Sequence, residues 1–178
     1  MKHNKLQTNN LELIAATFEY ICAELESPEK LASLLNTQVE PGWPPGEYDS
    51  NAQKFFHKCY KENGTSVVGW FVWYAITLPK NSIPSLLIGA GGYFGPPDKD
   101  GIVEIGFSIV PSQRQKGYAT EIAKALVENA FNDNRVQKII AHTTIHNKAS
   151  CKVLEKSGFH YIFNKQESDS LLFERQKQ

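Results

Sequence analysis

The chain has 178 residues, of which 41% are hydrophobic, and its 19 basic and 19 acidic side chains give a formal net charge of zero. This length suits one domain with a sizeable core, so we expect a single domain over residues 1–178. A neutral chain has no overall field that would draw it to nucleic acid or to an anionic membrane, so neither is an expected partner. The longest apolar run, residues 67–76, is much shorter than the roughly 20 residues that a membrane-spanning helix needs.

The start of the chain, the cysteines and the histidines bear on compartment and metal content. Polar residues, not an apolar stretch with a cleavage site, follow the first methionine, so we expect a cytoplasmic location. Cys22, Cys59 and Cys151 are widely spaced and odd in number, which predicts reduced thiols. His142 and His146 would lie on a strand and in the turn after it, with no acidic or cysteine partner nearby, so no metal site is expected.

The first part of the chain combines short helices with a proline-rich loop. Apolar residues alternate over residues 11–15, which predicts a short strand, and the patterns of residues 18–24 and 28–35 predict helices. Ser27 before Pro28 is a typical helix N-cap with proline at the first helical position. Prolines and glycines over residues 41–46 predict a loop that carries Trp43. Apolar residues at helical spacing over residues 49–63 predict a further helix with one buried face.

The remaining elements are mainly strands. Strand-like runs at residues 67–77, 85–93 and 103–110, separated by turns, predict an antiparallel meander. Helical spacing over residues 119–130 predicts an amphipathic helix that packs on a sheet. We then expect a strand, a helix closed by Gly158, and two short strands, at residues 138–144, 148–157, 159–163 and 170–173. Together the elements predict an α/β (α+β) fold with a mixed, mostly antiparallel sheet of about seven strands flanked by helices.

The segment of residues 104–120 predicts an anion-binding site. A strand passes through a polar loop directly into a helix, where unpaired backbone amides meet the positive end of the helix dipole. Gly117 lets the backbone approach a ligand, Ala119 keeps the first turn narrow, and Thr120 can donate a hydroxyl hydrogen bond. Basic side chains add positive charge: Arg114 and Lys116. An ordinary turn in which Gly117 only supplies the φ angle is the alternative.

Two other phosphate-binding motifs are absent from the sequence. A P-loop needs Gly-Lys followed by Ser or Thr, whereas the order here is Lys116-Gly117-Tyr118. The glycine-rich run over residues 89–95 has Phe94 where the dinucleotide fingerprint requires its third small residue. The anion site is therefore not of either nucleotide-binding type.

Two motifs resemble a known family. Arg114-Gln-Lys-Gly117-Tyr-Ala119 resembles the Arg/Gln-x-x-Gly-x-Gly/Ala signature of the GNAT superfamily, the acyl-CoA-dependent N-acyltransferases, in which this loop holds the CoA pyrophosphate. The stretch from Asn147 to Gly158-Phe159 looks like the family's second landmark, an Asn that opens a helix and a Gly-Phe that closes it. Residues 104–121, with residues 6–13, are similar in particular to the branch that contains ribosomal-protein-alanine N-acetyltransferases.

The resemblance implies a GNAT fold and acetyl-CoA as the acyl donor, with no metal. It implies a V-shaped opening between the strand of Glu104 and the strand of residues 138–144, into which pantetheine inserts. The implied cofactor-binding residues are Phe107, Ser108, Ile109, Arg114, Gln115, Lys116, Gly117, Tyr118, Ala119, Thr120, Asn147 and Ser150. Two of these have plainer alternatives, since Asn147 is a good helix N-cap and Tyr118 fits an ordinary first helical turn.

The resemblance also implies direct attack of an amine on the thioester in a ternary complex. An amine attacks only when neutral, so the removal of its proton must be assisted. Glu104 matches the position of the base and would act directly or through a water; a solvated residue at a strand end is the alternative. Leu154 replaces the tyrosine that conventionally protonates the leaving thiolate. Ser150 takes the place of a serine proposed for this role, or it bonds the preceding turn or the cofactor.

The implied acceptor site lies between the early helices, the loop after them and the strand opposite the cofactor. Glu104, Trp43 and Tyr93 are the predicted substrate-binding residues, with Phe94 beside Tyr93; core packing is the alternative for the aromatic ones. Asn10 and Ile14 replace early arginines of the ribosomal branch, which weakens the transfer of a ribosomal-protein target.

We therefore expect an N-acetyltransferase that transfers acetyl from acetyl-CoA to a primary amine, either a protein N-terminus or a small molecule. The alternative is a non-catalytic acyl-CoA-binding sensor or interaction module, which Leu154 favours. The sequence leaves the oligomeric state open, a homodimer included.

Overall fold

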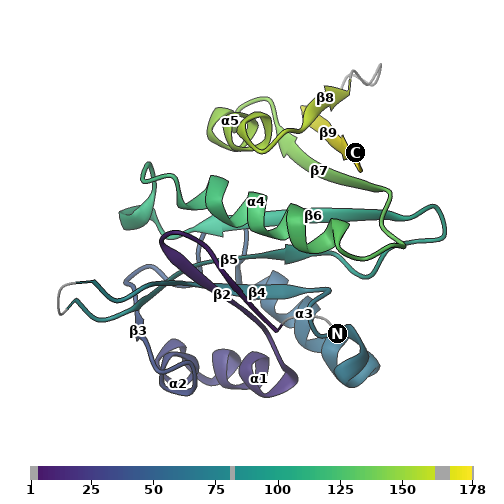
Figure 1. Cartoon of the computed structure of the whole chain (residues 1–178). Coiled ribbons are helices and arrows are strands. Elements are labelled where there is room, and N and C mark those ends of the chain that lie inside the picture. The colour runs from purple at the N-terminus through teal and green to yellow at the C-terminus, as the bar shows by residue number, and fades with distance from the viewer. Residues whose placement is uncertain (1–3, 81–82, 163–168, 178) are drawn as a thin grey trace.

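The computed structural model describes residues 4–80, 83–162 and 169–177, and Figure 1 shows their arrangement. The helices are α1 (Phe18–Glu26), α2 (Pro28–Leu34), α3 (Ser50–Asn63), α4 (Tyr118–Phe131) and α5 (Lys148–Lys156). The strands are β1 (Lys5–Gln7), β2 (Leu11–Ala15), β3 (Gln38–Val39), β4 (Val72–Thr77), β5 (Leu86–Tyr93), β6 (Ile102–Ile109), β7 (Lys138–Thr144), β8 (His160–Ile162) and β9 (Ser170–Gln176).

All these strands belong to one sheet of mixed direction. Their order is β1-β2-β4-β5-β6-β7-β9-β8, with β3 paired to β5 off this path. The β3–β5 and β6–β7 pairs are parallel, and the other pairs are antiparallel. The mostly antiparallel sheet and the β4–β5–β6 meander are thus confirmed.

The expected number of strands, about seven, was too low, because the described residues form a sheet of nine strands. Strands β1 and β3 were not predicted. Both are short and carry exposed or half-buried residues, so they lack the apolar alternation that marks a strand in a sequence. Backbone pairing with β2 and with β5 holds them in the sheet.

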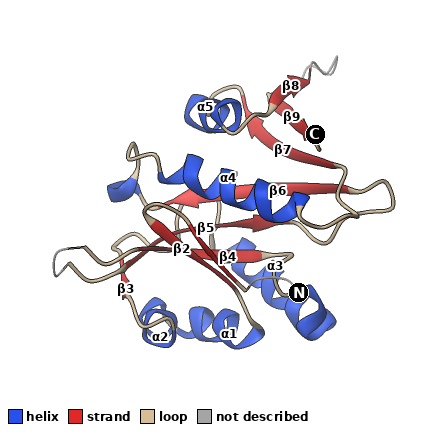
Figure 2. Ribbon diagram, in the orientation of Figure 1, coloured by secondary structure: helices blue, strands red, loops and turns tan. Residues whose placement is uncertain are grey.

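Helices cover both faces of the sheet, as Figure 2 shows: α1, α2 and α3 lie on one face, and α4 and α5 on the other. On the α4 face, Ile122 and Leu126 pack with Val103 and Ile105 of β6 in one core cluster. On the other face a second cluster joins the early helices to β4 and β5 through Ile21, Leu31, Phe56, Tyr74 and Leu87. The sheet is therefore buried on both sides, and any ligand must enter where the strands separate or the helices leave space.

The predicted strand over residues 67–77 begins later than expected. Residues Gly64–Val67 form a 3-10 turn, and Gly69 adopts φ 80°, so the backbone cannot be extended before β4 starts at Val72. Val67 and Trp70 are nevertheless buried, which is why the run looks like a strand in the sequence. At the other end of the chain, Phe163 of the predicted strand 159–163 lies outside the described residues.

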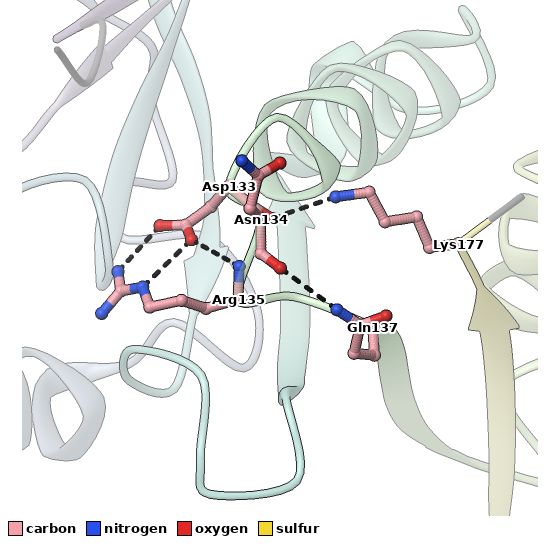
Figure 3. A network of polar contacts seen from close by, with 5 residues as sticks. All are labelled: Asp133, Asn134, Arg135, Gln137 and Lys177. Atoms are coloured by element: carbon pink, nitrogen blue, oxygen red, sulfur yellow. Dashed lines mark hydrogen bonds and ion pairs between the residues drawn. The ribbon is translucent and has the colours of Figure 1, made fainter.

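A polar network fixes the connection from α4 to β7 (Figure 3). The Arg135 guanidinium donates to both carboxylate oxygens of Asp133, at 3.0 and 2.7 Å, and its backbone amide donates to Oδ1 at 2.9 Å. Gln137 Nε2 donates to the Asn134 carbonyl at 3.1 Å, and Lys177 Nζ donates to the Asp133 carbonyl at 3.2 Å. Because β7 begins directly after this loop, the network sets where β7 lies against β6.

Glu121 ties the hairpin of β1 and β2 to helix α4. Its carboxylate accepts hydrogen bonds from the Thr8 hydroxyl and from the Asn10 backbone amide (2.7 Å) and side-chain amide (3.1 Å). Burial raises the pKa of Glu121, but these hydrogen bonds outweigh burial and hold the pKa below its usual value. In the sequence, Glu121 fits an exposed acidic residue in the first turn of a helix. In the structure it instead joins the hairpin of β1 and β2 to α4.

We expect Glu121→Gln to lower the free energy of unfolding by about 1 kcal/mol at neutral pH. The folded-state pKa is below the unfolded one, so the stabilisation is present above the unfolded pKa and is lost as the pH falls through the folded pKa. The difference between variant and wild type should therefore shrink in acid. Urea unfolding at neutral and acid pH measures this, with the exposed Glu128→Gln of the same helix as control. A pH-independent difference would contradict the assignment.

Candidate functional site

An opening lies between β6 and β7. The two strands pair only from Ile102 to Glu104, opposite Lys138 to Ile140. Beyond these residues β6 stays with β5 up to Ile109, and β7 stays with β9 up to Thr144. The edge of β6 that faces β7 therefore has no strand partner over residues 105–109 within the described chain. Backbone groups on such an edge are available to an extended ligand.

The loop after β6 presents free backbone amides. Gly117 is the N-cap of α4 with φ 86° and ψ −6°, and no heavy atom lies within 4 Å of the place where a Cβ would be. No side chain caps the helix. In the part of the chain that the structure describes, the amides of residues 117–120 have no hydrogen-bond acceptor. A helix start in this state is suited to an anion.

Two basic side chains of this loop bond only neutral groups. Arg114 Nε donates to the Ile109 carbonyl at 3.0 Å, and Lys116 Nζ donates to Gln113 Oε1 at 2.8 Å. Among the described residues neither side chain forms an ion pair with a carboxylate. Neither charge is neutralised by a direct ion pair, although Lys116 is near enough to Glu40 to help lower the pKa of that carboxyl. Gln115, between them, has a left-handed backbone with φ 61°.

Helix α5 brings the second motif beside α4 (Figure 1). Asn147 Oδ1 accepts a hydrogen bond from the Ser150 backbone amide at 3.1 Å, so Asn147 is the N-cap of α5. The Ser150 hydroxyl has no hydrogen-bond partner among the described residues, and it remains available to a ligand. Leu154, at the position where the family's tyrosine was expected, is 1% exposed and belongs to the core.

Glu104 and His142 lie against each other where the strands separate. His142 Nδ1 is 2.8 Å from Glu104 Oε1. The expectation that His142 has no acidic partner was wrong, because the parallel register places Glu104 opposite Ile140, two residues before His142. The His146 side chain is 81% exposed, and its Nε2 lies 3.8 Å from Asp169 Oδ2. No group of three His, Cys, Asp or Glu residues in the described ranges could hold a metal ion.

A cavity lies on the opposite face of β6 from α4. Because side chains alternate along a strand, Val103 and Ile105 enter the α4 core, whereas Glu104, Gly106 and Ser108 face the other way. A cavity of about 120 Å³ extends over this face, and we call it the α3 cavity. Its lining residues are Glu47, Tyr48, Ala52, Phe56, Phe71, Val72, Ala90, Gly91, Gly92, Tyr93, Phe94, Gly106, Phe107 and Ser108.

The three predicted substrate-binding residues differ in their relation to the α3 cavity. Glu104 is on the same face of β6, two residues from Gly106. Trp43 is not a lining residue but lies behind Tyr48, with ring centroids 6.1 Å apart. Tyr93 is 1% exposed, and its hydroxyl donates to the Leu126 carbonyl at 2.5 Å, so its side chain packs in the core, the alternative given above.

The loop that contains Gly46 also lies against the loop between β6 and α4. A Cβ on Gly46 would lie 2.7 Å from Ser108 Oγ and 3.6 Å from an Arg114 guanidinium nitrogen. Glu40 accepts hydrogen bonds from Ser112 and Gln113, which hold its pKa below the usual value. The loop of Gly46 therefore lies against both Ser108, which lines the α3 cavity, and Arg114 of the loop before α4.

A buried carboxylate, which the sequence does not predict, bonds one wall of the α3 cavity. Glu24 of α1 is 4% exposed and accepts hydrogen bonds from Trp43 Nε1 (2.9 Å), the Tyr48 hydroxyl (2.7 Å) and the Tyr74 hydroxyl (2.7 Å). Burial raises its pKa, against the effect of these hydrogen bonds. The helical spacing of α1 placed Glu24 with Ile21 on one face, but only the tertiary contacts show its partners. Glu24 thus orients three aromatic side chains, of which Tyr48 lines the α3 cavity.

We expect Glu24→Ala to lower the free energy of unfolding by about 2 kcal/mol, because two buried tyrosine hydroxyls and the partly buried Trp43 Nε1 lose their common acceptor. Chemical denaturation at neutral pH measures the loss. Glu19→Ala, at an exposed position of the same helix, is the control and should change stability by less than about 0.5 kcal/mol. Equal effects of the two substitutions would show that the Glu24 cluster contributes little.

The chain matches known acetyltransferases over most of its length. The family description "Acetyltransferase (GNAT) domain" matches residues 21–160. The uncharacterized N-acetyltransferase YjdG of Bacillus subtilis (strain 168) is 30% identical over 154 residues, which are 86% of this chain and 88% of YjdG. The chain therefore belongs to the GNAT acetyltransferase family, and it is an N-acetyltransferase.

Solved structures of this fold agree. RimL, a ribosomal L7/L12 alpha-N-protein acetyltransferase in complex with coenzyme A, has a TM-score of 0.62 at 16% identity, over 95% of each chain. Spermidine N-acetyltransferase from Vibrio cholerae, in complex with CoA and spermine, has a TM-score of 0.61 at 16% identity, over 95% of this chain and 96% of that one. The expected GNAT fold is thereby confirmed. Within the described ranges, no helix is both long and apolar enough to cross a bilayer.

Proposed function

We propose that this N-acetyltransferase uses acetyl-CoA to acetylate a primary amine, with Glu104 as the base. The observation that carries the proposal is the position of Glu104, which lies where β6 and β7 separate and faces the same side as the α3 cavity. A carboxylate there stands between an opening for an extended cofactor and a cavity for an acceptor. The CoA complexes of two proteins with this fold support the choice of cofactor.

The residues present fit CoA. The free amides of residues 117–120, with Arg114 and Lys116, suit the pyrophosphate. The unpaired edge of Phe107, Ser108 and Ile109 suits the amide groups of pantetheine. When bound, acetyl-CoA supplies the acetyl group as a thioester.

Glu104 accepts the proton that the attacking amine loses, directly or through a water. As the nitrogen bonds to the acetyl carbon, the carbon–sulfur bond breaks, and the sulfur takes a proton from the Ser150 hydroxyl or from water. His142 holds Glu104 Oε1 and thereby fixes the direction of the carboxylate. Position 154 is a leucine buried in the core, so this chain has no tyrosine there to serve as the acid.

Release of free thiol from acetyl-CoA, measured over a panel of amines and N-terminal peptides, tests this function. We expect release with at least one amine and none without an acceptor. The sensor alternative, which the buried Leu154 favours, predicts saturable binding of CoA with no release from any amine. That outcome would overturn the proposed function.

A further inference from the structure

The α3 cavity presents hydrocarbon surface almost throughout. Two of its lining residues are tyrosines, but both hydroxyls are bonded elsewhere: Tyr48 donates to Glu24, and Tyr93 donates to the Leu126 carbonyl. Phe56 and Phe94 add two aromatic rings, with centroids 6.2 Å apart. A ligand group in this cavity therefore finds apolar contacts and few hydrogen-bond partners.

The size of the cavity limits what enters. An apolar cavity of roughly 150 Å³ holds one benzene molecule. The α3 cavity has about 120 Å³ and is open to solvent, and Phe94 at its edge is 54% exposed. A single ring, or a branched aliphatic group of similar size, matches this space.

The charge of the cavity limits the number of ammonium groups. Glu47 is the one acidic residue among those that line it, and Glu47 is exposed. A polyamine or an aminoglycoside carries several ammonium groups, and each needs a carboxylate or water in place of its hydration. Apart from the exposed Glu47, the lining offers no carboxylate to such groups.

The direction of β6 connects the cavity to the reacting centre. Residues two apart on a strand face the same side and are separated by roughly 7 Å. Glu104 is two residues from Gly106, which lines the cavity, and the Phe94 ring lies over Gly106, 3.2 Å from where its Cβ would be. An amine joined to a ring by one or two carbons therefore reaches Glu104 while the ring remains in the cavity.

We propose that the acceptor of this enzyme is a small primary amine with one apolar group of ring size, such as an arylalkylamine or a branched alkylamine. This inference rests on the proposed function, since it names the acceptor class of the same site. It excludes polyamines and aminoglycosides as the preferred acceptors.

Thiol release with six acceptors tests the inference. We expect 2-phenylethylamine and 3-methylbutylamine to have kcat/KM at least about tenfold above that of methylamine, spermidine, kanamycin and an alanyl peptide. A preference for any of the last four would overturn the acceptor class and leave the acetyltransferase function intact. Release from none of the six would count against the proposed function instead.

Binding of 2-phenylethanol tests the cavity without turnover. This alcohol has the ring and the spacer but no amine, so we expect it to inhibit competitively against 2-phenylethylamine and to bind the CoA-loaded protein in calorimetry. Absence of such binding would overturn the inference whatever the outcome of the thiol assay.

Two substitutions locate the binding in the α3 cavity. Ala52→Phe places a ring into the space, and we expect it to raise KM for 2-phenylethylamine by about tenfold with unchanged CoA affinity. Lys54→Phe, at an exposed position of the same helix, is the matched control and should leave KM unchanged. Should Ala52→Phe fail to fold, Phe94→Ala removes an exposed wall of the cavity and should raise KM similarly. Unchanged KM in the folded variants would contradict the inference.

Discussion

Gly117→Glu should lower the affinity for CoA by about a thousandfold. Gly117 has φ 86°, which costs a residue with a Cβ roughly 1–2 kcal/mol. The larger effect is electrostatic, because two like charges about 4 Å apart repel by about 4 kcal/mol at an effective dielectric constant of about 20. That energy corresponds to about a thousandfold in a dissociation constant. Calorimetric titration of the purified variant with CoA measures the change.

The open space around Gly117 makes this test specific. No heavy atom lies within 4 Å of the place of a Cβ, so the new side chain meets the ligand and not the protein. Gly117→Gln has the same length without the charge, and we expect its loss to be nearer tenfold. Gly64→Glu makes the same change at another glycine with positive φ (60°) and open space, and its CoA affinity should stay that of the wild type. Unchanged affinity in Gly117→Glu would remove the loop from the cofactor site.

Local sequence patterns predicted the elements that carry the cofactor motifs. The strand predicted at residues 138–144 has the same bounds as β7, and the helix predicted over residues 119–130 differs from α4 by one residue at each end. Both have a clear period of apolar residues, since one face packs on a large core. The loop between β6 and α4 is equally local, because its glycine, proline and charges lie within one short segment.

The acceptor side could not be predicted in this way, because its contacts join distant parts of the chain. Glu24 bonds Tyr74, which is 50 residues away, and Glu104 meets His142, which is 38 residues away. No spacing or composition in the sequence indicates that the two members of either pair are in contact. Tyr93 was predicted to bind substrate, but its hydroxyl donates to the Leu126 carbonyl in the core. The sequence does not show in which direction this side chain points.

Glu104→Gln should lower kcat by about a thousandfold with unchanged CoA affinity, because general base catalysis contributes about a hundred- to ten-thousandfold. The amide that replaces the carboxylate cannot take the proton of the amine, whereas the loop before α4, which we propose to bind CoA, is unchanged. The rate of the variant should increase with pH toward the pKa of an alkylamine, about 10, because the neutral amine then forms without help. The wild-type rate should depend less on pH in that range.

Steady-state thiol release at neutral and alkaline pH, with calorimetric titration of CoA, separates this role from a structural one. Glu174→Gln is the matched control: Glu174 on β9 lies opposite Ile140 and is 3.0 Å from Lys138, so it loses a carboxylate and an ion pair near the same strand. Glu174 does not line the α3 cavity, and its ion-pair partner is Lys138 and not a residue of the opening. The kcat of Glu174→Gln should therefore stay close to that of the wild type. Equal losses in both variants would point to the sheet and not to a base, and full activity in Glu104→Gln would remove Glu104 from the mechanism.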